Sequence, residues 1–367
     1  DDVGFEAAYL ANKLGRPVRV QWMRDEETAW DTKGPAYAFT LRGALDAAGN
    51  PTAIEYEARA LDYNHVGYND PDTVLIAQLM GRRPEQPGRG GAATPSVQYG
   101  IANQRHTGHV VSLPMIWETP LRCGNLRDPN GPQVTFAFES FIDEMAAAAN
   151  ADPVQFRLNM IANSSEDDAF RKARSMATVQ AAADAYGWET RPSPNPMQRS
   201  TSGSSISSGR GIAYTYRSGT VVATIAEVEV NRDTGRIFVK RLVCAHDCGL
   251  VINPTGLQYT VECGMLHGLS RALWEEVQFD TEKVTSVDWA THPTMRHSDT
   301  PESIEVVIVN GDPNPDRSDL PHYGAGEASH KPMIAAIANA VFDATGVRLR
   351  RVPFRSARVL EALRGES

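Results

Sequence analysis

Glu327 follows two closely spaced glycines, Gly324 and Gly326, in the segment Tyr-Gly-Ala-Gly-Glu-Ala-Ser. Glycines at this spacing allow a tight turn and a close approach of the main chain to a ligand. Apolar residues then recur at helical spacing over residues 334–342, and Gly346 ends the run. We therefore expect Glu327 at or just before a helix start, where N–H groups favour anions. A carboxylate there can act as a base, or it can simply cap the helix.

A second stretch that could carry chemistry lies at residues 116–132. It is rich in turn residues, yet it also contains Trp117, Arg122, Cys123 and Arg127. A segment that only connects two elements has no need of an aromatic ring, a thiol and two guanidinium groups. We therefore expect this stretch to contribute to a site.

Cys244 and Cys248 flank His246, which suggests one half of a metal site. No second pair of cysteines with comparable spacing occurs elsewhere in the sequence. A cysteine at the end of a buried strand is more often a small apolar side chain. We therefore expect no metal ion held by side chains.

Gln258, Gly264 and Gly268 share a predicted helix at residues 257–277, which follows the helix-initiating pair Asn253-Pro254. Glycines four residues apart on a helix admit either a second backbone or a flat ligand. Both interpretations stay open. The sequence has no Gly-x-Ser-x-Gly elbow, no phosphate loop ending in Gly-Lys-Ser/Thr and no Gly-x-Gly-x-x-Gly fingerprint, which disfavours hydrolases, phosphoryl transfer and nicotinamide enzymes.

Length and composition bound the class of protein. The 367 residues, 41% of them hydrophobic, suffice for two domains of a globular chain. No apolar run approaches the ~20 residues of a membrane span, and a net charge of -9 without a basic stripe argues against nucleic acid. Four cysteines leave the compartment open. Because the chain starts without Met or a signal-peptide pattern, we expect a fragment or a processed product.

The elements that must position these residues follow from hydrophobic periodicity and turn chemistry. We expect helices at residues 5–14, 133–145, 152–160, 167–186, 257–277 and 334–346, strands at 17–23 and 304–309, and hairpins at 37–61 and 221–243. This order predicts a mixed α/β (α+β) fold: two successive domains of β-hairpins with flanking helices. The predicted domains are 1–189 and 211–367, and a Ser- and Pro-rich linker at 190–210 joins them.

Several of these stretches, in this order, resemble the molybdopterin-binding large subunit of the xanthine dehydrogenase and aldehyde oxidoreductase family, in particular its isoquinoline 1-oxidoreductase-like branch. The residues that carry the resemblance are Gly15-Arg-Pro-Val-Arg-Val-Gln-Trp-Met-Arg24, Leu121-Arg-Cys-Gly-Asn-Leu-Arg127, Phe138-Glu-Ser-Phe-Ile-Asp-Glu144, Asp152-Pro, Asp247-Cys-Gly249, Asn253-Pro, Gly324-Ala-Gly-Glu327, Ala338-Asn-Ala340 and Ala344-Thr-Gly346. The resemblance spans nearly the whole chain and corresponds to the C-terminal portion of such a large subunit.

The resemblance implies that Glu327 is the catalytic base and that Arg122 orients the substrate or stabilises negative charge. Glu327 and Arg122 are then expected to line a cleft from opposite sides. It also implies contacts to the cofactor from the glycine loop and from the Gln258 helix, namely from Gln258, Gly264, Gly268, Gly324, Gly326 and Ala328. His267 stands where many relatives have glutamine, which puts the hydrogen bonds of this helix to the pterin in doubt.

The implied cofactor is molybdenum on a pterin dithiolene, in the cytosine dinucleotide form, with no side-chain ligand to the metal. Glu327 would take a proton from a labile hydroxyl while an aldehyde or electron-poor N-heteroaromatic is hydroxylated with water as the oxygen source. The implied partners are a chain supplying the N-terminal half of the large subunit, a small [2Fe-2S] subunit, and a flavin or cytochrome acceptor. The family is consistent with a bacterial cytoplasm or periplasm and does not decide between them.

Two alternatives belong to other classes of function. The chain could be a non-catalytic scaffold that keeps the fold and helps assembly, or a small-molecule binding protein that uses the same cleft without molybdenum. Replacement of Glu327 discriminates, because only the catalytic hypothesis needs its carboxylate.

Overall fold

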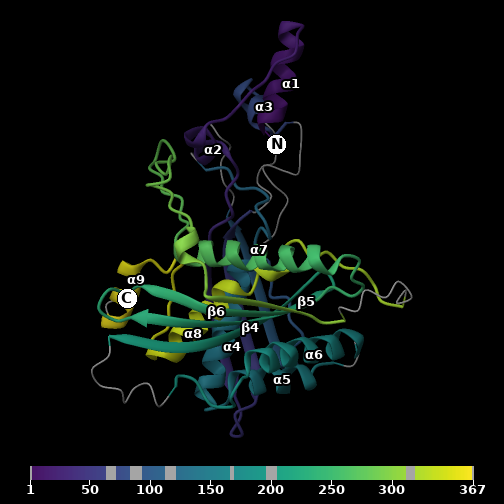
Figure 1. Cartoon of the computed structure of the whole chain (residues 1–367), viewed down its shortest axis with the longest axis vertical. Helices are drawn as coiled ribbons and strands as arrows, with labels where there is room; N and C mark the ends of the chain where they lie inside the picture. Colours follow the sequence, from purple (N-terminus) through teal and green to yellow (C-terminus); the bar gives the residue numbers. More distant parts are fainter. Residues whose placement is uncertain are drawn as a thin grey trace.

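Two β-sheets organise the part of the chain that the structure, a computed structural model, describes: residues 2–62, 72–82, 93–111, 121–165, 169–195, 205–310 and 319–365. Helices cover both faces of the larger sheet, and an arm of N-terminal helices projects from the body (Figure 1). The predicted mixed α/β class is confirmed.

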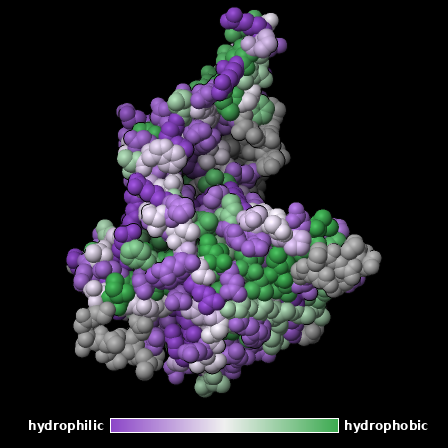
Figure 2. All heavy atoms as spheres, in the orientation of Figure 1, coloured by the Kyte–Doolittle hydropathy of each residue, from purple (hydrophilic) through white to green (hydrophobic). Residues whose placement is uncertain are grey.

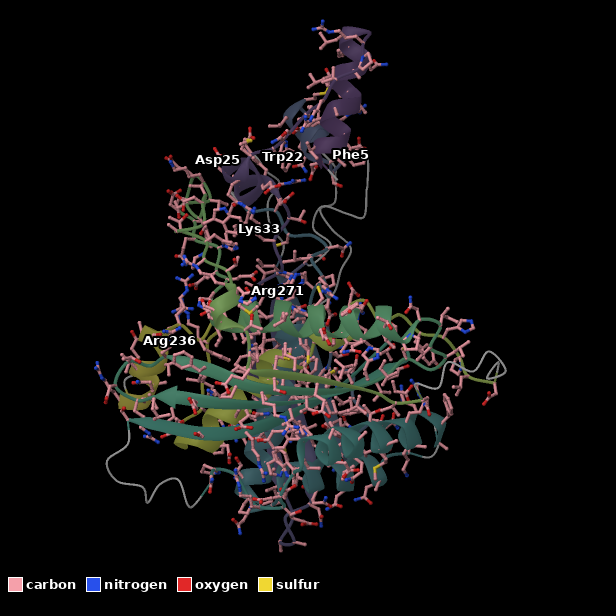
Figure 3. The ribbon with its side chains drawn as sticks, in the orientation of Figure 1. Phe5, Trp22, Asp25, Lys33, Arg236 and Arg271 are labelled. Atoms are coloured by element: carbon pink, nitrogen blue, oxygen red, sulfur yellow. The ribbon has the colours of Figure 1, made fainter. Side chains whose placement is uncertain are left out.

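The arm contains α1 (Asp2–Leu14), α2 (Arg24–Trp30) and α3 (Leu75–Leu79). The predicted first helix is confirmed, but no residue of α1 is buried, and Figure 2 shows apolar side chains exposed along the arm. The predicted strand at residues 17–23 is wrong, since this segment has no regular structure. It pairs with no strand of the described ranges, and Trp22 instead donates a hydrogen bond from Nε1 to Glu6 Oε2 at 2.8 Å. Figure 3 shows Trp22 and Phe5 in the arm.

The smaller sheet has the order β1-β2-β3, with β1 at Tyr37–Leu45, β2 at Pro51–Leu61 and β3 at Asn103–Val111. The predicted hairpin of β1 and β2 is confirmed, and its turn is closed by Asp46, whose Oδ1 accepts from the N–H groups of Ala48 and Asn50. β3 pairs in parallel with β2 and was not predicted. A parallel neighbour far along the chain leaves no turn signal in the sequence.

The larger sheet has the order β4-β5-β6-β7: β4 at Ile206–Arg217, β5 at Thr220–Asn231, β6 at Ile237–Asp247 and β7 at Ser303–Ile308. The predicted pair at 221–243 and the strand near 304 are confirmed. β4, however, begins inside the predicted linker. Its small residues serve packing: a Cβ on Gly209 or Gly211 would lie 2.4 or 2.2 Å from the main chain of Ala340, so a helix crosses this strand at close range.

The larger sheet separates two apolar cores. One core lies under α7 (Pro254–Leu273), α8 (Met333–Thr345) and α9 (Ser356–Arg364), and α9 was not predicted. The other is formed with α4 (Gly131–Ala148), α5 (Pro153–Ala162), α6 (Ala169–Tyr186) and the smaller sheet. This second core joins residues from both sides of 190–210, so the predicted domains 1–189 and 211–367 share a core.

The helix boundaries follow the predicted signals. Asp152 caps α5 by accepting from the N–H groups of Val154 and Gln155, and Gly346 ends α8 with a φ of 75°. No helix within the described ranges is long and apolar enough to cross a membrane.

Candidate functional site

Glu327 lies directly before the short helix η4 (Ala328–His330), which precedes α8. It occupies the capping position of η4, but its side chain makes no capping hydrogen bond, so the capping interpretation is not supported. Its side chain is 37% exposed. A Cβ built on Gly324 or Gly326 would meet no atom of the described residues within 4 Å, so this part of the chain leaves the glycine loop beside the carboxylate open.

Both carboxylate oxygens of Glu327 accept hydrogen bonds. Oε1 accepts from the main-chain N–H of Asp128 at 3.0 Å, and Oε2 accepts from Arg217 Nε at 2.9 Å and from Arg217 Nη2. Burial alone would raise the pKa of Glu327, but these hydrogen bonds and the charges of Arg217 and Arg127 outweigh it and lower the pKa. Glu327 is therefore an ionised, partly open carboxylate.

Asp128 is a second carboxyl group beside the first. It is 1% exposed, and its Oδ1 lies 3.4 Å from Arg217 Nε, so one guanidinium contacts both carboxyl groups. Burial raises the pKa of Asp128 to about 6, although the charges of Lys331 and Arg217 oppose this rise. The pair thus places two carboxyl groups with opposite pKa shifts around Arg217.

Arg127 ties the loop at 121–131 to the glycine loop and to α7. Its Nε donates to the Gly326 carbonyl at 2.7 Å, and its Nη1 donates to Cys263 Sγ at 3.4 Å and His267 Nδ1 at 3.2 Å. The carbonyl of Arg127 accepts from Arg271 at 3.1 Å. Figure 3 labels Arg271 on the body, below the projecting arm.

Positive charge exceeds negative charge around Glu327. Within the described residues, Arg127, Arg271 and Lys331 form no ion pair, and Lys331 donates to the Tyr216 carbonyl at 3.1 Å. His330 is fully buried beside Arg271, and neither of its ring nitrogens has a hydrogen-bond partner there. Burial and these neighbouring cations lower the pKa of His330 well below its usual value.

The predicted cofactor residues on α7 have a different surrounding. A Cβ on Gly264 would lie 2.1 Å from Ser329 Oγ, and one on Gly268 would lie 2.5 Å from Met333 Cβ. Both glycines are therefore covered by this chain and let η4 and the start of α8 pack against α7, so a direct contact with a ligand is not supported. Gln258 is exposed and donates to Glu262 at 2.8 Å. Ala328 is buried in the core.

Arg122 does not meet Glu327 among the contacts of the described residues. Its Nη1 donates to Asp2 Oδ2 at 3.0 Å and to the Trp30 carbonyl at 2.8 Å, and its side chain is buried. The expectation that Arg122 and Glu327 face each other across a cleft therefore needs correction, because the carboxylate of Asp2 holds Arg122 at the arm. Trp117, from the same stretch, lies outside the described residues.

Three residues that surround Glu327 were not predicted: Asp128, Arg217 and Lys331. Arg217 ends β4 just before a tight turn in which Ser218 and Gly219 have φ values of 47° and 98°. The turn brings Thr220 Oγ1 to the Gly324 carbonyl at 2.8 Å. The unusual composition of residues 116–132 was the only signal that pointed to this cluster.

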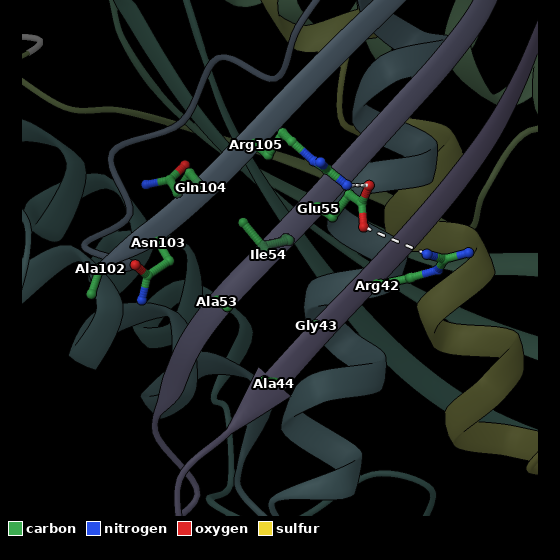
Figure 4. A pocket seen from close by; sticks show the side chains of 10 residues that line it. All are labelled: Arg42, Gly43, Ala44, Ala53, Ile54, Glu55, Ala102, Asn103, Gln104 and Arg105. Carbon is green, nitrogen blue, oxygen red and sulfur yellow. Dashed lines mark hydrogen bonds and ion pairs between the residues drawn. The ribbon is translucent and has the colours of Figure 1, made fainter.

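A surface pocket lies elsewhere, on the smaller sheet. It has a volume of about 620 Å³ and opens on the smaller sheet, where Glu55 pairs with Arg105 and, at 3.7 Å, with Arg42 (Figure 4). None of its lining residues belongs to the Glu327 cluster. The Glu327 cluster therefore does not coincide with this pocket.

Comparison with known proteins identifies the family. Two family models, both described as molybdopterin cofactor-binding domains, match residues 3–161 and 130–301. The chain belongs to the molybdopterin-binding xanthine dehydrogenase family. Over its whole length it is 32% identical to a nicotinate dehydrogenase subunit of Pseudomonas putida, and over 96% of its length it is 29% identical to the beta subunit of isoquinoline 1-oxidoreductase of Brevundimonas diminuta. The chain spans 29% and 40% of the lengths of these relatives.

Solved structures share the fold of this family member. The aldehyde oxidoreductase of Desulfovibrio desulfuricans superposes with a TM-score of 0.74 at 17% identity, covering 96% of this chain and 52% of that one. Quinoline 2-oxidoreductase of Pseudomonas putida superposes with a TM-score of 0.73 at 14% identity, covering 98% of this chain and 66% of that one. At these identities the likeness establishes the fold.

The surroundings of Glu327 fit an anionic pterin cofactor. Molybdopterin carries a dithiolene and a phosphate, and beside its open glycine loop this family member offers Arg127, Arg271 and Lys331, which form no ion pair within the described residues. Of these cations, Arg127 is only partly buried, and it is bonded to the main chain of that loop. The described residues hold no group of three or more potential side-chain ligands for a metal. A metal held by the pterin itself needs no such side-chain ligands and is therefore compatible with this site.

Proposed function

We propose that this chain is part of a molybdenum hydroxylase in which Glu327 is the catalytic base. The observation that carries the proposal is an ionised carboxylate, partly exposed beside an open glycine loop, in a chain of a molybdopterin-binding family. The relatives named as dehydrogenases and oxidoreductases of nicotinate, isoquinoline and aldehydes support an N-heteroaromatic or an aldehyde as the substrate.

When bound, the cofactor supplies a water-derived oxygen atom and takes up two electrons from the substrate. Arg127 and the main chain of Gly324 and Gly326 would hold it. Glu327 accepts the proton that the oxygen source releases, and it does so at Oε1. Oε1 receives one hydrogen bond, whereas Oε2 receives two from Arg217 and has less free acceptor capacity.

The assembly around this chain is part of the proposal. The relatives are named as single subunits, which supports transfer of the electrons to [2Fe-2S] clusters on a partner and onward to a flavin or cytochrome. The relatives are also much longer, so we propose that the remaining part of the molybdenum subunit is needed to retain the cofactor. Stoichiometric molybdenum on the isolated chain would contradict this. The cytosine dinucleotide form of the cofactor is tested by release of CMP on acid hydrolysis.

Replacement Glu327→Gln in the assembled enzyme tests the central claim. Turnover should fall by about 10²- to 10⁴-fold, the usual contribution of a general base, while molybdenum content and assembly stay unchanged. Glu361→Gln on the exposed face of α9 is the matched control for loss of one negative charge. Unchanged turnover in Glu327→Gln would sink the catalytic hypothesis and favour the scaffold.

A further inference from the structure

Asp128 is a buried carboxyl group beside Glu327 to which the proposed reaction gives no role. Arg217 Nε lies 2.9 Å from Glu327 Oε2 and 3.4 Å from Asp128 Oδ1. Asp128 also donates a hydrogen bond from its main-chain N–H to Glu327 Oε1 at 3.0 Å. Asp128 therefore acts on both carboxylate oxygens of Glu327. It contacts Oε1 directly through its main-chain N–H, and it acts on Oε2 indirectly through the shared Arg217.

The conformation of Asp128 is costly. Its φ is 51°, in the left-handed region, and its Oδ2 is buried without a hydrogen-bond partner in the described part of the chain. Gly131 makes room for this carboxyl group, since a Cβ there would lie 2.0 Å from Oδ2. A strained main chain and an unpaired buried oxygen are features that a fold retains mainly at functional sites.

Charged groups from every element packed around Asp128 act on it. Lys331 after η4, Arg217 on β4 and Arg271 on α7 favour its ionised form, whereas burial and Glu327 oppose it. The outcome is a pKa of about 6, in contrast to the lowered pKa of Glu327. Asp128 therefore changes charge near neutral pH while Glu327 remains ionised.

We propose that Asp128 is a positioning residue for Glu327: its N–H orients the carboxylate, and its side chain competes for Arg217 and thereby sets how readily Glu327 accepts a proton. This inference rests on the proposed function of Glu327 as the base. Above about pH 6 the ionised Asp128 draws on Arg217 and repels the charge of Glu327, which makes Glu327 the stronger base. Below that pH the neutral Asp128 leaves Arg217 to Glu327, so the base is weaker and turnover falls.

The test is Asp128→Asn in the assembled enzyme, with Asp128→Gly as a second variant. Asn and Gly both tolerate a left-handed φ and keep the main-chain N–H, so either variant can fold with Glu327 in place. We expect kcat at pH 8 to fall by about threefold to tenfold, as for a moderately weakened base, with KM unchanged. The decrease of kcat near pH 6 should disappear. A variant that keeps the wild-type decrease near pH 6 overturns the proposal, and so does one that changes KM alone.

A second measurement needs no turnover. In isotope-edited infrared spectra of the 367-residue chain with labelled aspartate, a protonated carboxyl band should vanish with a midpoint near pH 6 and be missing in Asp128→Asn. Glu361→Gln should leave the band unchanged. Failure of the proposed function is separate: Glu327→Gln would then retain turnover. A missing band in the wild-type chain would instead overturn the inference about Asp128.

Discussion

Two carboxylates in this chain are each held by one arginine and one main-chain N–H, yet only one is open. Glu139 is 0% exposed: Oε2 accepts from Arg157 Nε at 2.8 Å and from the Tyr214 N–H at 2.9 Å, and Oε1 accepts from the Tyr99 hydroxyl at 2.7 Å. Arg157 is equally buried. Every partner of this pair lies within the protein.

The pair of Glu327 and Arg217 has the same parts but is 37% and 32% exposed. Among the described residues, its surroundings contain cations that form no ion pair and an open glycine loop, whereas the Glu139 network is closed by aromatic side chains. The comparison shows that a carboxylate held by an arginine and an N–H has a structural role where all of its hydrogen bonds are made within the protein. It becomes a candidate for chemistry where acceptor capacity faces open space.

The largest effect should come from Glu139→Ala. Removal of this carboxylate leaves the buried charge of Arg157 with only the more distant Asp143, at 3.6 Å, which costs about 3–5 kcal/mol of unfolding free energy. Denaturant unfolding followed by circular dichroism measures the loss. Glu302→Ala, which removes an exposed partner of Lys240, should leave the unfolding midpoint unchanged. A Glu139→Ala chain as stable as the wild type would break the distinction between the closed and the open pair.

A smaller effect separates the glycines of α7 from those of the open loop. Gly264→Ala places a methyl group on Ser329 Oγ, and such overpacking costs about 1–3 kcal/mol. Gly326→Ala meets no atom within 4 Å, so its thermal stability should stay near that of the wild type. If the open loop borders the cofactor, Gly326→Ala should still lower molybdenum content in the assembled enzyme. Equal destabilisation by both substitutions would show that the loop is closed.

The smallest effect concerns a buried histidine on β6. His246 is fully buried, neither ring nitrogen has a partner among the described residues, and burial lowers its pKa to about 4. As pH falls, His246 is therefore protonated in the unfolded chain before it is protonated in the folded chain. The free energy of unfolding consequently decreases below about pH 6.5. Between pH 7.5 and 5.5 the loss is about 1 kcal/mol for this group. Unfolding curves of His246→Leu should show a pH dependence weaker by that amount, and identical slopes would contradict the assignment.

The sequence correctly predicted the elements whose signals are local. The hairpin at Asp46, the Asp152 cap and the Gly346 helix end all depend on neighbours within a few residues, and all were correct. β3 and β4 were missed for two physical reasons. β3 has no buried face and so lacks an alternating apolar pattern, and the small residues of β4 have a linker composition because α8 packs closely on them.

The site divides in the same way. Glu327 and its glycines were predictable because their spacing is a local pattern, and the structure places them in the open loop. Arg217 and Asp128 reach Glu327 over 110 and 199 residues of sequence, so no window of the chain could pair them. Arg122 was placed by resemblance, but the ion pair with Asp2 draws it to the arm.

The stretch 121–131 has two anchors of different kind. One end is fixed to the projecting arm by the ion pair of Arg122 with Asp2 and by two main-chain hydrogen bonds of Lys33. The Lys33 N–H donates to the Arg122 carbonyl at 2.7 Å, and the Gly124 N–H donates to the Lys33 carbonyl at 3.1 Å. Arg127 and Asp128, only a few positions later, fix the other end to the loop of Glu327. A displacement of the arm would therefore be transmitted to the loop that carries Glu327 along a single short piece of main chain.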